Sequence, residues 1–231
     1  MPTSYPGAID AFVNPTSADT LSNPPHDGQH ANINDAVEAI ETELGINPRG
    51  ALATVRARLD RLDPVVGHVE LSANSSLIAF TDIPQDRRHL RLVAYLRGTT
   101  GSTATPCFMQ FNGDTTGKYD LQTVRGTGST ASAAHTSSDT GGRFAVPGAG
   151  AHTTLFAPVL VDIPAYRGTG WRHFIINYGW GSSAVVGSSS GDLKMENVYG
   201  HWRGTAAITS IQLVCSAGNW QAGSIATLHG T

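Results

Sequence analysis

The feature that most constrains the fold is a change in hydrophobic period near Val65. Before this point apolar residues recur every three or four positions, which favours helices, and after it apolar and polar residues alternate, which favours half-buried strands. The charge changes at the same place. Residues 1–64 contain nine acidic residues and four arginines, a net charge of −5, whereas residues 65–231 have a net charge of +2. We therefore expect two differently built parts of the chain.

Residues 1–31 are rich in proline, asparagine, serine and threonine. Prolines at positions 2, 6, 15, 24 and 25 oppose a regular helix, so this segment is predicted to be an extended arm that needs a partner to become ordered. His26 and His30 have the spacing of two zinc ligands on a helix, but Gly28 and the prolines argue against a helix there, and no third ligand is evident. We expect no metal and no cofactor.

Residues 32–64 are predicted to form a short helical stalk of two helices. The first begins at Asn32 or Asn34 and ends at Gly45, and the second begins at Asn47. Apolar residues follow a coiled-coil spacing in both helices: Ile33, Val37, Ile40, Leu44, Leu52, Val55, Leu59 and Leu62. Because the apolar stripe is narrow and both helices are short, self-association would supply the missing burial. The alternative is that the two helices fold back as an antiparallel hairpin, and the spacing leaves the number of chains open.

Residues 65–231 alternate in short runs that predict an antiparallel, jelly-roll-like β-sandwich. The predicted strands are Gly67–Leu71, Leu77–Phe80, His89–Arg97, Pro106–Phe111, Tyr119–Arg125, Leu155–Asp162, Arg172–Tyr178, Leu193–Tyr199, Ile208–Cys215 and Ser224–Leu228. In His89–Arg97 the leucines point to one face, and Arg91 and Arg97 point to the other. Two stretches of small residues, Gly126–Gly142 and Gly181–Gly191, are predicted to be long exposed loops. The fold class is therefore mainly β.

Composition excludes several classes of protein. Fifteen basic and eighteen acidic residues give a net charge of −3, which lacks the positive charge of a nucleic-acid binder. No apolar run approaches the roughly 20 residues that cross a bilayer, and the N-terminus does not resemble a secretory signal, so we expect a protein made in the cytoplasm that does not enter a membrane. Cys107 and Cys215 lie in apolar segments, which favours free buried thiols over the one disulfide they could form.

No enzyme signature is found, and we expect no catalytic residue. Gly187–Gly191 matches the Gly-x-Ser-x-Gly motif, but it lacks the strand and helix that this motif needs on either side. Asp114–Asp120 has Thr116 and Lys118 where a calcium loop has oxygen-rich ligands, and it has no closing glutamate, so it is better explained as a hairpin loop. The candidate ligand contact is the segment His201, Trp202 and Arg203, because aromatic rings at strand ends can stack on sugars. The alternative is that the tryptophans belong to the core or to a subunit contact.

A fixed order of polar, aromatic and proline residues runs through the first 45 positions: Tyr5-Pro6, Asp10, Phe12, Asn14-Pro15-Thr16, Asp19, Leu21, Asn23-Pro24-Pro25-His26, Gln29-His30-Ala31-Asn32 and Asn34-Asp35-Ala36. This order resembles the N-terminal segment of tailed-bacteriophage virion appendage proteins, which are described as tail fibres, minor tail proteins or head fibres. The C-terminal part is similar, less specifically, to β-sandwich modules of such proteins, through Phe80–Pro84, Arg88–Leu92, Phe111–Asp114, Ile208–Leu213 and Gly223–Gly230.

The resemblance implies a homotrimeric virion structural protein with an N-terminal attachment segment, a short coiled coil and a β-rich head at residues 65–231. Residues 1–31 would dock on other virion proteins, of the capsid or of the tail. The attachment residues would be Tyr5, Pro6, Phe12, Asn14, Pro15, Pro25, His26 and His30. The alternative function is a receptor-binding or carbohydrate-binding adhesion module that recognises a glycan on the host cell surface. The collagen-like, β-helical and depolymerase segments of longer family members are missing from this chain.

Overall fold

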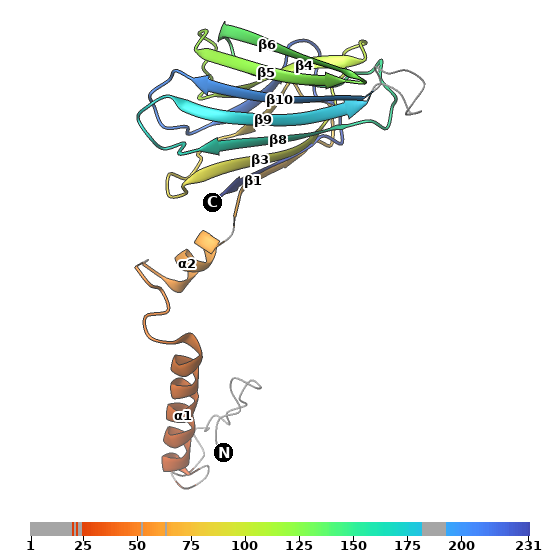
Figure 1. Cartoon of the computed structure of the whole chain (residues 1–231). Helices are drawn as coiled ribbons and strands as arrows, with labels where there is room; N and C mark the ends of the chain where they lie inside the picture. Colours follow the sequence, from red (N-terminus) through yellow and green to blue (C-terminus); the bar gives the residue numbers. More distant parts are fainter. Residues whose placement is uncertain (1–19, 21, 23–24, 52, 63, 182–192) are drawn as a thin grey trace. The chain divides into compact units, whose positions relative to one another are not determined.

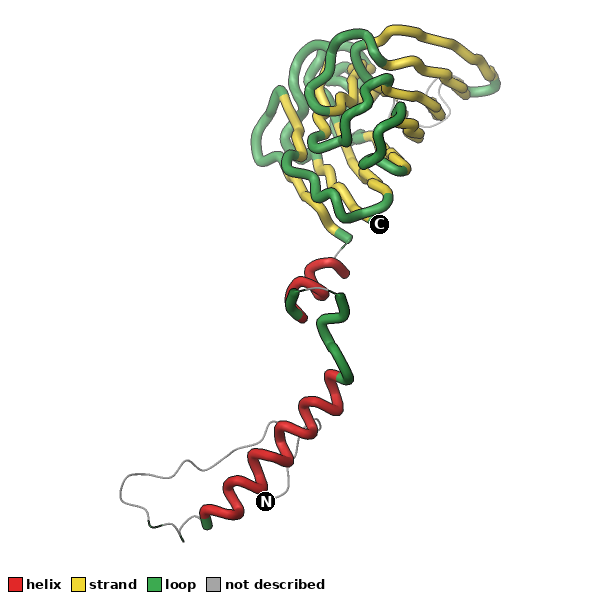
Figure 2. Tube along the Cα trace, turned by 90° about the vertical axis from the view of Figure 1, so that its left-hand side faces the viewer, coloured by secondary structure: helices red, strands yellow, loops and turns green. Residues whose placement is uncertain are grey.

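The computed structural model describes residues 20, 22, 25–51, 53–62, 64–181 and 193–231, and divides into two units, Met1–Asp63 and Pro64–Thr231. Among these residues, all helices belong to the first unit and all strands to the second (Figure 2). The first unit contains α1 (His26–Leu44) and α2 (Val55–Leu62). Neither described helix is both long enough and apolar enough to cross a bilayer.

Helix α1 begins six residues before the predicted start at Asn32. Pro25 is its N-cap residue, and the N–H of Gln29 donates to the Pro25 carbonyl at 3.1 Å to close the first turn. A proline at this position removes no helical hydrogen bond, because the first N–H groups of a helix have no partner within it. For residues 26–31 the prediction of an extended segment, and of Gly28 preventing a helix around His26 and His30, is therefore wrong.

The end of α1 agrees with the sequence pattern, and the start of α2 does not. Gly45 follows α1 with a φ of 72°, and its N–H donates to the carbonyl of Glu41 at 2.9 Å, as predicted for a terminating glycine. The predicted second start at Asn47 is wrong, since Asn47 and Gly50 both have positive φ and close a turn through a 2.8 Å hydrogen bond. Positive φ interrupts a right-handed helix, so α2 begins only at Val55.

The second unit, called the β unit below, contains two antiparallel sheets (Figure 1). In spatial order the eight-stranded sheet contains β1 (Val65–Glu70), β12 (Ile225–Gly230), β3 (His89–Leu96), β8 (Ala157–Pro164), β9 (Arg172–Gly181), β10 (Leu193–Trp202), β5 (Tyr119–Thr127) and β6 (Thr130–Asp139). The four-stranded sheet contains β2 (Leu77–Phe80), β11 (Ile211–Cys215), β4 (Ala104–Phe111) and β7 (Gly142–Pro147). The mainly β prediction is confirmed.

The core of the β unit lies between the two sheets. Strand β3 alternates strictly between exposed and buried residues, as the sequence predicted. Its buried leucines join one apolar cluster with side chains from the four-stranded sheet, among them Met109, Phe111 and Leu213. Each such side chain contributes about 1.5–3 kcal/mol when it is fully removed from water. The outer face of the eight-stranded sheet, which faces away from this core, is therefore free to present other side chains.

Three sequence predictions for the β unit are wrong. Most of Gly126–Gly142 is not a loop, because it forms the end of β5, a turn and the edge strand β6. Nearly all residues of β6 are exposed, so the strand has no apolar alternation that could have identified it. Strand β7 was also missed. The segment after Asn112 is not a hairpin, since it connects β4 in one sheet to β5 in the other. The loop predicted at Gly181–Gly191 lies outside the described residues from 182 onward.

The predicted orientation of Arg97, the residue that follows β3, is wrong. The sequence alternation places it on the solvent side, but only 1% of its surface is exposed. Its guanidinium donates to Gln221 and to four carbonyls of the segment 148–155. Burial lowers its pKa, and these acceptors compensate for the lost water.

Cys107 and Cys215 lie directly opposite each other on β4 and β11. Both are free thiols, and their sulfur atoms are 4.0 Å apart. Burial raises the pKa of the Cys107 thiol. Cys107 is buried, as predicted, whereas Cys215 is only half-buried.

Candidate functional site

Trp202, a predicted ligand contact, belongs to the core. The Trp202 side chain lies on the face of β10 that packs on the four-stranded sheet. There its ring packs edge-on against Phe111, with centroids 5.8 Å apart. Its Nε1–H donates to Asp114 at 2.8 Å. Only 3% of Trp202 is exposed, so it cannot contact a ligand in this structure, and that prediction is wrong.

His201 lies on the opposite, outer side of β10, where the structure places a group of exposed rings. The indole of Trp171 stacks on the imidazole of His201, with centroids 5.1 Å apart and an angle of 17° between the planes. His173 stands directly opposite His201 on β9, and their rings meet edge to face at 5.9 Å. Trp171 is 54% exposed. A tryptophan this exposed, and held by a second ring, offers a flat apolar surface to a ligand.

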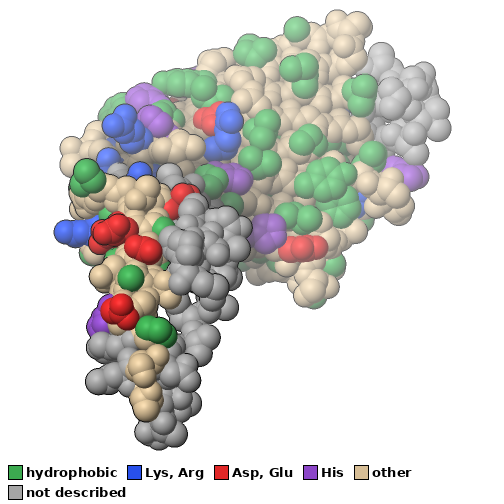
Figure 3. All heavy atoms as spheres, turned by 90° about the horizontal axis from the view of Figure 1, so that it is seen from below, with side chains coloured by type: hydrophobic (Ala, Val, Ile, Leu, Met, Phe, Trp, Pro, Cys, Tyr) green, Lys and Arg blue, Asp and Glu red, His purple; other side chains and the backbone are tan. Residues whose placement is uncertain are grey.

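Tyr199 completes the group, which we call the aromatic cluster: Trp171, His173, Tyr199 and His201. The rings of Tyr199 and His173 stack with centroids 5.9 Å apart, and the Tyr199 hydroxyl lies 2.7 Å from His173 Nδ1. Tyr199 is nearly half exposed. Figure 3 shows hydrophobic side chains and histidines distributed over the visible surface of the β unit.

Asp120 and Arg203 lie beside the aromatic cluster. Asp120 Oδ2 is 2.9 Å from His201 Nε2 and 3.4 Å from Arg203 Nε. A hydrogen bond from the backbone N–H of Ser138, and the nearby charges of Arg203 and His201, lower the pKa of Asp120. Arg203 also donates to the carbonyl of Gly117 at 2.6 Å. Its guanidinium is therefore engaged by the protein, and it holds Asp120 rather than standing open to a ligand as predicted.

Asp114 supports the cluster from the core side. Burial alone would raise its pKa, but hydrogen bonds from Thr116, Trp202 and Lys118 outweigh burial and lower the pKa to about 2. The carboxylate therefore stays charged at neutral pH and fixes the Trp202 indole, which adjoins His201 in the chain.

The loop between β8 and β9 positions Trp171. The guanidinium of Arg172 is buried and donates to the carbonyls of Tyr166, at 3.0 Å, and of Gly170. It also donates to the carbonyl of Ala206, at 3.1 Å. Burial lowers the pKa of Arg172. The Arg172 side chain thus bonds to both ends of the β8–β9 loop and to the segment at Ala206. These bonds fix the position of Trp171 over His201.

The exposed rings of the aromatic cluster offer a surface for binding. His201 and Asp120 form an imidazole–carboxylate pair, but in the described part of the chain no serine, threonine or cysteine contacts either nitrogen of His201. The same residues contain no group of three His, Cys, Asp or Glu side chains that could hold a metal ion. What the cluster does offer is exposed ring faces beside polar edges, which is the surface that sugars and protein partners use.

The remaining predicted residues lie in the first unit. Four residues of the α1 stripe, Ile33, Val37, Ile40 and Leu44, are between 42% and 51% exposed. Val55 and Leu59 lie on α2, Leu62 is its last residue, and Leu52 is outside the described residues. Of the predicted attachment residues, Pro25 caps α1, and His26 and His30 lie within it. The others, Tyr5, Pro6, Phe12, Asn14 and Pro15, lie outside the described residues.

Comparison with known proteins identifies no relative of this chain. No family model matches the sequence, and searches of curated proteins and of solved structures found no match.

Proposed function

We propose that the chain is a structural protein of a bacteriophage virion, a trimeric fibre or decoration appendage. Residues 1–31 attach it to other virion proteins, the helices form its coiled-coil stalk, and the β unit is its head. The N-terminal resemblance supports the virion assignment. The structural observation that supports self-association is the apolar stripe of α1, which is about half exposed in the single chain.

The exposed stripe favours association of several copies. Burying the exposed half of each of its four residues contributes about 1 kcal/mol per residue and per chain. Helix α2 has eight residues, which is too short for a stable helix in water without a packing partner. A parallel coiled coil of three chains supplies that partner for both helices, and the number three follows from the resemblance.

The sheet topology supports a jelly-roll arrangement of the head. In the eight-stranded sheet β12 pairs with β3, β3 with β8 and β10 with β5, and in the four-stranded sheet β11 joins β2 to β4. These neighbours are distant in sequence, so the chain passes repeatedly between the two sheets, as it does in jelly rolls.

Deletion of residues 2–24 tests attachment. This deletion keeps all of α1, which begins at His26, and its N-cap residue Pro25. We expect the variant to keep its oligomeric state and its folded head, and to be missing from purified particles by immunoblotting. Incorporation of the shortened protein at the wild-type level would contradict the attachment role.

A second function, recognition of a host-surface glycan by the head, is favoured by the aromatic cluster. Stacking of Trp171 on His201 fixes an exposed indole face without any internal role for it in the core. Such a face packs against the C–H surface of a sugar ring, and the polar edges of His173 and Tyr199 lie within reach of hydroxyl groups. The two functions are compatible in one protein.

Trp171→Ala tests glycan recognition. We expect at least a tenfold loss of binding to the glycans that wild type retains on a glycan array, which corresponds to about 1.4 kcal/mol. The matched control is Tyr95→Ala, because Tyr95 is also an exposed aromatic residue of the eight-stranded sheet and stacks on Phe156 instead. Equal binding by wild type and Trp171→Ala would contradict this function.

A further inference from the structure

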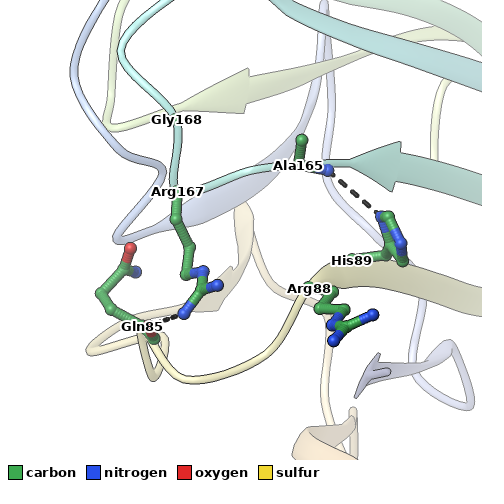
Figure 4. Close-up of a pocket in the computed structure, with 6 residues that line it drawn as sticks. All are labelled: Gln85, Arg88, His89, Ala165, Arg167 and Gly168. Atoms are coloured by element: carbon green, nitrogen blue, oxygen red, sulfur yellow. Dashed lines mark hydrogen bonds between the residues drawn. The ribbon is translucent and has the colours of Figure 1, made fainter.

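A hollow of about 710 Å³ lies beside the β8–β9 loop, at the end of the sheet where β3 begins. Its lining comes from two segments, one before and at the start of β3 and one after β8 (Figure 4). The lining residues are Gln85, Arg88, His89, Ala165, Arg167 and Gly168. In Figure 4 Arg167 stands on one side of the hollow, with Arg88 and His89 on the other.

Among the described residues, the lining contains two guanidinium groups and no carboxylate. Arg167 donates through one nitrogen to the backbone carbonyl of Gln85 at 2.7 Å, which fixes its position and leaves further N–H groups free to donate. The Arg88 side chain is exposed, and it has no ion pair within the part of the chain that the structure describes.

The carboxylates nearest to these residues in the sequence and across the sheet already have partners. Asp86 lies 3.5 Å from the guanidinium of Arg87. Asp162 accepts two hydrogen bonds from Arg91, at 2.7 and 3.1 Å. The oxygen of Thr231 accepts hydrogen bonds from the backbone N–H groups of Arg88 and His89. Asp86 and Asp162 therefore pair with arginines other than Arg88 and Arg167.

His89 adds a donor to the hollow. Its Nδ1 accepts a hydrogen bond from the backbone N–H of Ala165 at 3.2 Å. A neutral imidazole that accepts at Nδ1 bears its proton on Nε2, so the exposed edge of His89 donates. Two guanidiniums and an imidazole N–H thus surround one open space.

We propose that this hollow is a binding site for an oxyanion, a carboxylate or phosphate group of a larger ligand. A guanidinium binds both oxygens of such a group at once, and charge-assisted hydrogen bonds of this kind are about twice as strong as neutral ones. The site is shaped in advance, since Gln85 holds Arg167 and Ala165 holds His89.

The hollow and the aromatic cluster share the outer face of one sheet. His89 pairs with Pro164 on β8, and β8 in turn pairs with β9 as far as Asp162 and Ile175. Adjacent strands lie about 4.8 Å apart, so β3 and β9 are about 10 Å apart where both pair with β8. A saccharide with an acidic substituent spans this distance. The sugar-binding part of this proposal rests on the second proposed function, glycan recognition. The oxyanion site does not depend on that function.

The test measures binding of the full-length chain to three polymers by surface plasmon resonance at about 50 mM salt, where charge effects are not screened away. The polymers are polygalacturonate, poly(glycerol phosphate) and neutral dextran. We expect one or both of the anionic polymers to bind at least ten times more tightly than dextran. If only one of them binds, it identifies the oxyanion as carboxylate or as phosphate. The double variant Arg88→Gln/Arg167→Gln is expected to lose at least tenfold in that binding.

Arg91→Gln is the control, because it removes one positive charge, against two in the double variant, from an exposed residue of β3 whose guanidinium is occupied by Asp162. We expect it to change binding less than twofold. Weak binding of both anionic polymers by wild type, or equal binding by the double variant and wild type, overturns the site. If the double variant loses binding to polygalacturonate, which has both a sugar ring and a carboxylate, and Trp171→Ala does not, the oxyanion site stands and stacking on this sugar fails. If Trp171→Ala alone loses binding, the reverse holds.

Discussion

Replacing Arg97 by methionine is expected to lower the free energy of unfolding of the β unit by about 4 kcal/mol, because it breaks a buried hydrogen-bond network. The guanidinium donates to the carbonyls of Gly148, Ala151, His152 and Leu155 at 2.5 to 3.0 Å. Methionine fills a similar volume and donates nothing, so these carbonyls lose their donor. Each buried acceptor left without a donor costs about 1–3 kcal/mol, and water recovers part of this cost.

Urea unfolding of the full-length chain, followed by tryptophan fluorescence, measures this effect. Trp220 and Trp202 are buried in the β unit and report on its core. Arg91→Met is the control, since Arg91 is an exposed arginine of β3, the strand that precedes Arg97, and pairs of exposed charges contribute at most about 1 kcal/mol. An Arg97→Met variant as stable as Arg91→Met would show that Arg97 does not hold the segment 148–155.

The environment of Arg97 shows why part of the fold could not be predicted. The alternation of His89–Leu96 is a local property, and it correctly identified β3 and its buried leucines. The acceptors of Arg97 come from a segment about fifty residues later and from Gln221, and no local pattern specifies such a meeting. Helix α1 was predicted from its period, but its start was misplaced because Pro25 was taken as an obstacle rather than as a cap.

The candidate site could also be predicted from the sequence only in part. His201 was identified as an aromatic-flanked residue at a strand end, but its neighbour Trp202 points to the opposite face, because successive side chains of a strand alternate. Trp171 and Tyr199 are visible in the sequence as aromatic residues near strand ends. His173 was missed, since its meeting with His201 depends on the register between β9 and β10.

Placing two glutamates in the α1 stripe, as Val37→Glu/Ile40→Glu, is expected to convert the proposed trimer to single chains. In the proposed coiled coil each substitution brings three carboxylates together in an apolar seam, where neither water nor a basic partner stabilises them. We expect association to weaken at least a hundredfold, about 3 kcal/mol. The head should remain folded, because no residue of α1 belongs to the core cluster of the β unit.

Thr42→Glu is the control for this variant. Thr42 is exposed, and it lies on the side of α1 away from the stripe, as the period of 3.6 residues per turn requires. The same charge at this position should leave the oligomer intact. Equal dissociation by the control and the double variant would mean that added charge, and not loss of the stripe, causes the change.

The central claim is that the chain associates through its helices, and its molar mass in solution tests this most directly. Size-exclusion chromatography with light scattering on the full-length chain should give three times the chain mass of 24.2 kDa. Under the same conditions Val37→Glu/Ile40→Glu should give the mass of one chain. A wild-type mass of 24.2 kDa would contradict the account, because the apolar stripe of α1 would then have no partner copies.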